Sequence, residues 1–184
     1  MSNNFITPAD ILEYWFSKNS KQYWFASTPE IDSEIRKNYE KIWVRAAAGE
    51  LNDWQNNAEG SLALIIILDQ FPLNMFRGDA KSFKTENMAV EVALNAINNG
   101  YDEELSNEEE QLFLFMPLMH SEDLDHQNLQ VYLFEKYNFN LDYSAHHQDI
   151  VKKFGRFPHR NEILGRMSTM EELDYLLSDS AFKG

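Results

Sequence analysis

Residues 62–68 read LALIIIL, an apolar run that ends at Asp69 and Gln70. Three consecutive isoleucines favour a β-strand, because branched side chains pack well on a pleated sheet. A strand needs a partner, since an isolated strand leaves its backbone N–H and C=O groups without hydrogen bonds. The sequence offers no second run of this kind. We therefore predict that residues 62–68 form a fully buried central helix.

Helix-capping signals recur on both sides of this run and predict an entirely helical fold. A threonine followed by proline marks a helix start, because threonine caps free N–H groups and proline suits the first helical position. A serine followed three residues later by glutamate fits the capping box. The four signals are Thr7-Pro8, Thr28-Pro29, Ser106 with Glu109, and Ser168 with Glu171. We expect one all-α domain over residues 1–184, an antiparallel array of about eight or nine helices.

Glycine and proline predict further helix boundaries. Glycine often follows the last residue of a helix, because it adopts the left-handed conformation there, whereas proline interrupts a helix. The predicted starts are Thr85, Ser121, Leu141 and Pro158, and the predicted ends are Gly100, Tyr137, Gly155 and Gly165. We also expect Pro117 to kink or end the helix that contains residues 112–119.

Composition excludes several functional classes. The chain has 30 acidic and 16 basic residues, a net charge of −14, which disfavours nucleic acids and anionic membrane surfaces as partners. It has no cysteine, which rules out disulfides, thiolate metal sites and cysteine nucleophiles. The apolar runs are far shorter than the ~20 residues of a membrane span. The first residues show no secretory signal, so we expect a cytoplasmic protein.

Three segments place charged or imidazole groups beside apolar residues: 68–78 (LDQFPLNMFRG), 117–124 (PLMHSEDL) and 146–166 (HHQDIVKKFGRFPHRNEILGR). Charges this close to a core must be paired or face a cavity, because burying them alone is costly. With the LEYWF start at residues 12–16 and the capping signal at 168–172, these motifs cover most of the chain.

On these motifs the chain resembles the bacterial "domain of unknown function 924" family. The resemblance implies an all-α, tetratricopeptide-like helical array, and it implies no activity, because the family has no established one. The chain departs from the family's pattern at Leu73, where arginine is frequent. This difference removes one candidate cation from the first segment.

The three segments predict a pocket for a small anionic molecule, because guanidinium groups suit carboxylates and phosphates. Arg77, Arg156, Arg160 and Arg166 are four of the six arginines. The candidate ligand-binding residues are Asp69, Gln70, Arg77, His120, Glu122, His147, Arg156, His159, Arg160 and Asn161. In the alternative interpretation, the arginines pair with Asp69, Glu122 and Glu162 and lock helices together. The array would then be an interaction scaffold that binds a peptide.

Metal binding and catalysis have weaker support. His120, Glu122, His147 and His159 are metal-ligand types, but they lack a metal-binding spacing, and residues two apart do not share a helix face. We expect neither a metal nor a cofactor. His120 with Glu122, or His147 with Asp69, could form an acid–base pair, and Ser121 could act as a nucleophile beside a histidine. The sequence leaves open both enzymatic activity and oligomeric state.

Overall fold

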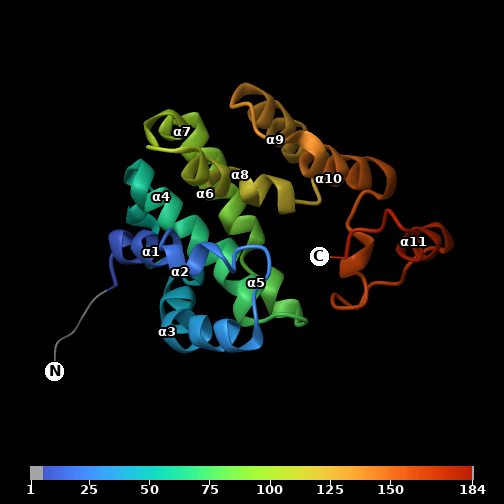
Figure 1. Cartoon of the computed structure of the whole chain (residues 1–184), viewed down its shortest axis with the longest axis horizontal. Coiled ribbons are helices and arrows are strands. Elements are labelled where there is room, and N and C mark those ends of the chain that lie inside the picture. Colours follow the sequence, from blue (N-terminus) through green and yellow to red (C-terminus); the bar gives the residue numbers. More distant parts are fainter. Residues whose placement is uncertain (1–5, 184) are drawn as a thin grey trace. The chain divides into compact units, whose positions relative to one another are not determined.

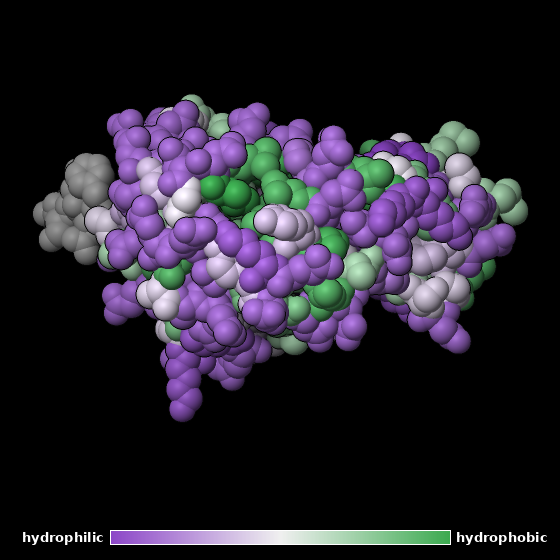
Figure 2. Space-filling model, turned by 90° about the horizontal axis from the view of Figure 1, so that it is seen from above, coloured by the Kyte–Doolittle hydropathy of each residue, from purple (hydrophilic) through white to green (hydrophobic). Residues whose placement is uncertain are grey.

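The computed structural model describes residues 6–183, and within that range all regular structure is helical (Figure 1). Eleven α-helices lie in this part of the chain, and three of them have five residues or fewer. The eight longer helices agree with the predicted eight or nine. The all-α prediction is therefore confirmed. Hydrophilic residues cover most of the face shown in Figure 2, as the net charge of −14 leads one to expect.

The chain divides into two compact units, residues 1–117 and residues 118–184, which we call the N-terminal and C-terminal units. The single domain over residues 1–184 stays a prediction. No helix among residues 6–183 is long and apolar enough to cross a membrane.

The N-terminal unit contains the first ten helical elements of the chain and most of an eleventh. In order they are α1 (Pro8–Trp15), α2 (Lys18–Lys21), α3 (Pro29–Ala47), η1 (Asn52–Asn56), α4 (Ala58–Ile65), η2 (Ile66–Gln70), α5 (Phe71–Met75), η3 (Ala80–Phe83), α6 (Glu86–Asn98), α7 (Tyr101–Glu104) and α8 (Glu108–His120). The last of these continues past Pro117 into the C-terminal unit.

The central segment forms a buried helix, as predicted. Every residue from Leu62 to Leu68 is at most 1 % exposed. The helix changes type within the run, because α4 passes into the π-helical turn η2 and then into α5. In this turn the Phe71 N–H bonds to the Ile66 carbonyl, five residues back. The π turn was not predicted.

A buried hydrogen-bond chain lies beside the π turn. Pro72 has no N–H to donate to the Leu68 carbonyl, four residues back. The Thr85 hydroxyl donates to that carbonyl at 2.6 Å and accepts from Trp43 Nε1 at 3.0 Å. Thr85 precedes α6 as predicted, but its side chain makes no cap hydrogen bond there. Its role is to join α3 and α6 to the central segment.

Some predicted helix starts are confirmed and others are displaced. Thr7 and Thr28 cap α1 and α3 as expected. The first turn of α8 is capped by Asn107 rather than Ser106, since Asn107 Oδ1 accepts from the Glu110 N–H at 3.0 Å. The cap of α11 is Thr169, whose box partner is Glu172, rather than Ser168 with Glu171. In both places the next residue is also a strong cap former, so the local pattern fits two registers.

The C-terminal unit contains the last residues of α8, followed by α9 (Leu124–Lys136), α10 (Leu141–Phe154), η4 (Pro158–Arg160) and α11 (Met170–Leu176). The α10 prediction is confirmed at both ends, and Gly155 is left-handed with φ of 67°. Asp123, not Ser121, caps α9. Pro117 does not end α8, which runs three residues further to His120.

Candidate functional site

Glu122 and Arg166 form an ion pair with two hydrogen bonds in the C-terminal unit. Two guanidinium nitrogens of Arg166 donate to the two Glu122 oxygens at 2.6 and 2.8 Å. The Phe157 N–H also donates to Glu122, at 2.8 Å. Burial raises the pKa of Glu122, but the bonds from Arg166 and Phe157 outweigh it and leave the pKa below its ordinary value. The pair ties the end of α8 to the turn that holds η4.

Arg156 is bound in the same way by Glu172, which we did not predict as a partner. Its Nε and Nη2 donate to the two Glu172 oxygens at 2.6 and 2.8 Å, and Nη2 also donates to the Met167 carbonyl. Glu172 is 2 % exposed. The hydrogen bond from Arg156 lowers the pKa of Glu172 to about 2. Asn161 joins the two pairs, since it donates to Glu172 and accepts from Arg166 Nε at 3.0 Å.

The remaining candidate arginine of this segment, Arg160, donates from Nη2 to the His120 carbonyl at 2.8 Å. Its guanidinium lies over the Phe157 ring, 4.7 Å from the ring centroid. Arg156, Arg160 and Arg166 therefore all contact groups of the chain itself. These contacts support the alternative interpretation, in which the arginine-rich segment locks helices together.

Two candidate histidines lie against the ring of Phe182, near the end of the chain. The ring centroids of His147 and His159 are 4.4 and 5.0 Å from that of Phe182. His147 Nδ1 donates to the Tyr143 carbonyl at 2.7 Å. Burial lowers the pKa of both imidazoles to about 4, so both are neutral at pH 7. The sequence reasoning missed Phe182, because a single ring near a terminus carries no motif.

The candidate metal ligands do not come together in the described residues, whereas the candidate nucleophile Ser121 does lie beside a histidine. Among residues 6–183, no group of three or more His, Cys, Asp or Glu side chains is arranged to hold a metal ion. Ser121 does lie beside a histidine, since its hydroxyl is 2.9 Å from His126 Nδ1. The same hydroxyl accepts from the Asp123 N–H at 3.2 Å. Ser121 is also buried, and these contacts fit a role in the turn before α9.

Three of the ten candidates belong to the N-terminal unit. Asp69 and Gln70 are buried in the π turn, where Gln70 Nε2 donates to Asp69 Oδ2 at 2.5 Å. Arg77 binds Asp32, with Nε 2.8 Å from Oδ2. Asn74 donates to the same carboxylate at 2.8 Å. The other seven candidates belong to the C-terminal unit, where Glu122, Arg160 and Asn161 share one hydrogen-bonded region.

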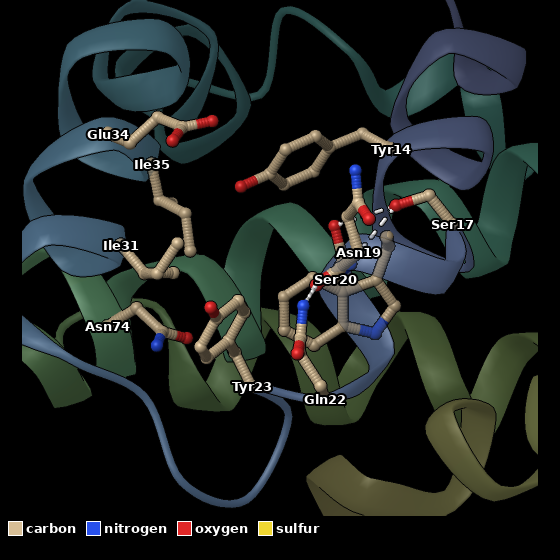
Figure 3. A pocket seen from close by; sticks show the side chains of 11 residues that line it. Tyr14, Ser17, Asn19, Ser20, Gln22, Tyr23, Ile31, Glu34, Ile35 and Asn74 are labelled. Atoms are coloured by element: carbon tan, nitrogen blue, oxygen red, sulfur yellow. Dashed lines mark hydrogen bonds between the residues drawn. The ribbon is translucent and has the colours of Figure 1, made fainter.

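The N-terminal unit also holds a cavity that the sequence reasoning did not find (Figure 3). It encloses about 380 Å³ between the α1–α2 segment, α3 and α5. The lining residues are Tyr14, Trp15, Ser17, Asn19, Ser20, Gln22, Tyr23, Ile31, Glu34, Ile35 and Asn74. Most of these positions resemble ordinary helix or loop positions in sequence. Their common feature, one shared hollow, arises from packing between elements far apart in the chain.

Charge and polarity are unevenly distributed in the cavity wall. Figure 3 shows the Tyr14 hydroxyl and the Glu34 carboxylate pointing into the same space. Burial raises the pKa of Tyr14, and the negative charge of Glu34 raises it further. The Glu34 side chain is exposed, and no hydrogen bond or ion pair joins it to a described residue. It is the one formally charged side chain among the described lining residues.

Trp15, one of the lining residues, carries a donor atom that is itself fully buried. Trp15 is 3 % exposed, and its Nε1–H has no hydrogen-bond partner among residues 6–183. Its ring packs edge-on against Phe71 and Phe113 at 5.7 and 5.4 Å. These contacts hold the indole in place, although they leave its polar atom unsatisfied. A buried N–H of this kind is uncommon in folded proteins and needs an explanation.

Comparison with known proteins gives a family and a fold but no activity. A family model described as "Bacterial protein of unknown function (DUF924)" matches residues 11–180. The solved structure of a protein of unknown function from Agrobacterium tumefaciens is 39 % identical, with a TM-score of 0.86. The match covers 92 % of this chain and 96 % of that one. No curated protein sequence matches the chain.

Proposed function

Since the chain belongs to the DUF924 family of bacterial proteins of unknown function, we propose its role from its own geometry: it binds a small polar molecule in the cavity of the N-terminal unit. The observation that carries the proposal is the cavity wall, in which the Glu34 carboxylate and the Tyr14 hydroxyl point into the same space (Figure 3).

The size and lining of the cavity support the proposal. Its volume of about 380 Å³ falls within the range of roughly 300–1,000 Å³ typical of small-molecule sites. Ile31, Ile35 and the tyrosine rings supply apolar surface, and the serine and amide side chains supply hydrogen-bonding groups. This combination is typical of binding pockets, in which a few polar groups orient a ligand on an apolar wall.

The predicted anion site is less well supported. Arg77, Arg156 and Arg166 each bind a carboxylate of the chain, at 2.6–2.8 Å. An anion at these residues would have to displace Asp32, Glu172 or Glu122 and leave that carboxylate without its partner. We therefore place the ligand in the N-terminal cavity rather than at the arginine-rich segment.

Two tryptophan variants in α3 test the proposal. Ile31→Trp should fill the cavity from its wall, whereas Val44→Trp adds the same side chain to an exposed position of the same helix. We expect a library of small amines, alcohols and carboxylates, screened by thermal shift, to stabilise the wild type and Val44→Trp. The same compounds should not stabilise Ile31→Trp. Equal shifts in all three proteins, or no shift in any, would contradict the proposal.

One observation favours the interaction scaffold as a second candidate function. Met167, Met170, Leu173 and Leu177 are all exposed at the start and along one side of α11. Exposed acidic residues Glu171 and Asp174 lie on the same helix. An apolar stripe with acidic neighbours complements a basic amphipathic helix, in which apolar side chains alternate with lysines. The partner we propose for this surface is such a helix.

Synthetic peptides test the scaffold. A helical peptide of leucine and lysine should bind the wild type in fluorescence anisotropy, and its leucine–glutamate counterpart should not. Leu173→Ser with Leu177→Ser should abolish that binding, while Val44→Ser, an exposed apolar change in the other unit, should preserve it. Equal binding of both peptides, or of all three proteins, would exclude α11 as the docking site.

A further inference from the structure

We infer that the molecule bound in the N-terminal cavity is a small organic cation, such as an amino alcohol or its quaternary counterpart. Glu34 would hold the ammonium group, and the aromatic rings would contact it. This inference rests on the proposed function and adds the chemical class of the ligand.

Formal charge is the first argument. Among the described lining residues Glu34 is the charged one, and no lysine, arginine or histidine lines the cavity. The lining residue Asn74 donates to Asp32, but Arg77 pairs with that carboxylate, so Asp32 adds no net charge to the wall. A ligand with a positive charge would therefore meet an attractive field, whereas an anion would meet repulsion from Glu34.

Aromatic surface is the second argument. Figure 3 shows Tyr14, Tyr23 and Glu34 around the same space. The negative face of an aromatic ring attracts ammonium groups, and cages of such rings with an acidic side chain are a recurring way to bind them. The Tyr14 ring is supported by Tyr39, 4.9 Å away between ring centroids, and Tyr39 is stacked on Phe71 at 4.6 Å. The Tyr14 ring is thus held in place by its neighbours.

The charge of Glu34 acts within this group of rings. Burial is the main cause of the raised pKa of both Tyr14 and Tyr39, and the Glu34 carboxylate adds to the shift at each. A hydroxyl whose ionised form is disfavoured stays neutral and can donate or accept hydrogen bonds. The cavity therefore presents one negative charge and neutral polar groups.

Size is the third argument. Small ammonium compounds, such as amino alcohols and their quaternary counterparts, fit within about 380 Å³.

Probes matched in shape separate charge from size. Choline and 4-aminobutan-1-ol are cations with a hydroxyl, 3,3-dimethylbutan-1-ol is the neutral counterpart of choline, and 3,3-dimethylbutanoate is an anion of similar shape. Titration calorimetry should show that both cations bind the wild type, with the neutral and anionic probes weaker by about tenfold or more.

Two charge-matched variants complete the test. Glu34→Gln should weaken the cations about tenfold or more and leave the neutral probe unchanged. Glu30→Gln removes the same charge from an exposed position of α3 that does not line the cavity, and it should leave all affinities unchanged. Thermal melts should show that both variants are folded.

The outcomes distinguish this inference from the proposed function. Tight binding of the neutral or anionic probe, or cation binding that is equal in the wild type and Glu34→Gln, would overturn the inference that the ligand is a cation. The proposed function, a small-molecule cavity, would still stand. Failure of all four probes, together with no effect of Ile31→Trp in the library screen, would overturn both.

Discussion

Single side chains decide where the interior of this protein remains polar. Thr85 is 1 % exposed, yet its hydroxyl serves two partners, the Leu68 carbonyl and Trp43 Nε1. Removing this hydroxyl is costly, because both of its partners would stay buried without a hydrogen bond. At this scale the structure depends on satisfying hydrogen bonds rather than on the amount of buried apolar surface.

Replacing Thr85 by valine should therefore destabilise the N-terminal unit by about 2–4 kcal/mol, because it removes one donor and one acceptor at constant shape. Thr85→Ser keeps the hydroxyl and should cost much less. Chemical denaturation followed by tryptophan fluorescence measures both free energies of unfolding. Equal losses in the two variants would show that the methyl group, not the hydroxyl, matters.

His147 should make stability sensitive to mild acid. Its pKa is about 4 in the folded state against an ordinary 6.5, so the unfolded chain binds more protons between these values. Stability should fall as the pH drops from 6.5 to about 4, by roughly 3 kcal/mol for a shift of this size. His159 should add a loss in the same window, because burial also lowers its pKa to about 4.

The variant His147→Asn tests this pH dependence, because its amide can still donate to the Tyr143 carbonyl but cannot titrate. Thermal melts between pH 7 and pH 4 should show a smaller decline for His147→Asn than for the wild type. His146→Asn, at the neighbouring and less buried position, should keep the full decline. An unchanged decline in His147→Asn would locate the acid sensitivity elsewhere.

At the scale of elements, close approach between η1 and α4 depends on a glycine. A Cβ atom at Gly60 would lie 2.1 Å from the backbone oxygen of Trp54. The two elements would have to separate to admit a methyl group. The contact also brings η1 against the N-terminal turn of the helix that leads into the central buried run.

Gly60→Ala should consequently destabilise the protein by about 2 kcal/mol or more, because a backbone atom must move. Gly78→Ala is the matched control, since no atom lies within 4 Å of its Cβ and only the positive φ of 79° is strained. That change should cost about 1 kcal/mol. Urea unfolding curves give the free energy of unfolding of both variants. An equal loss of stability in the two would mean that η1 can move away from α4 at little cost.

Local signals predicted the elements better than the contacts between them. Gly155 and Thr28 were placed correctly, because a left-handed cap and a threonine–proline pair act within one helical turn. The caps of α8 and α11 were each displaced by one residue where two cap formers adjoin. The π turn was missed because it accompanies the bond from Thr85 to Leu68, seventeen residues apart.

The candidate site was harder to predict for the same reason. Of the three carboxylates that the alternative interpretation paired with arginines, Glu122 does bind one, Arg166. The partner of Arg156 is Glu172, which the sequence did not single out. The cavity around Tyr14 and Glu34 was not predicted at all, because it forms only when α1, α3 and α5 pack together.

At the scale of the whole molecule, two compact units share one helix. The boundary between them falls at Pro117, inside α8, which is continuous from Glu108 to His120. If one unit unfolded alone, the part of α8 in that unit would be lost, and the remaining part of α8 in the other unit would become a frayed helix end. We therefore expect the two units to unfold together, as the predicted single domain requires.

Two probes of one urea titration can test this cooperativity. All four tryptophans lie in the N-terminal unit, so their fluorescence reports that unit, whereas far-ultraviolet circular dichroism reports helices in both. We predict coincident midpoints. A separate dichroism transition without a change in fluorescence would show that the C-terminal unit is an independent domain.

The Leu68 carbonyl has a consequence for sequence change in this protein. Pro72 withholds the usual α-helical donor from that carbonyl, and Thr85 supplies another. The two positions are therefore expected to show epistasis: a hydroxyl at 85 is worth most while proline occupies 72. A lineage that first replaced Pro72 by alanine would relax the demand on Thr85, whereas the reverse order of mutations would pass through a less stable intermediate.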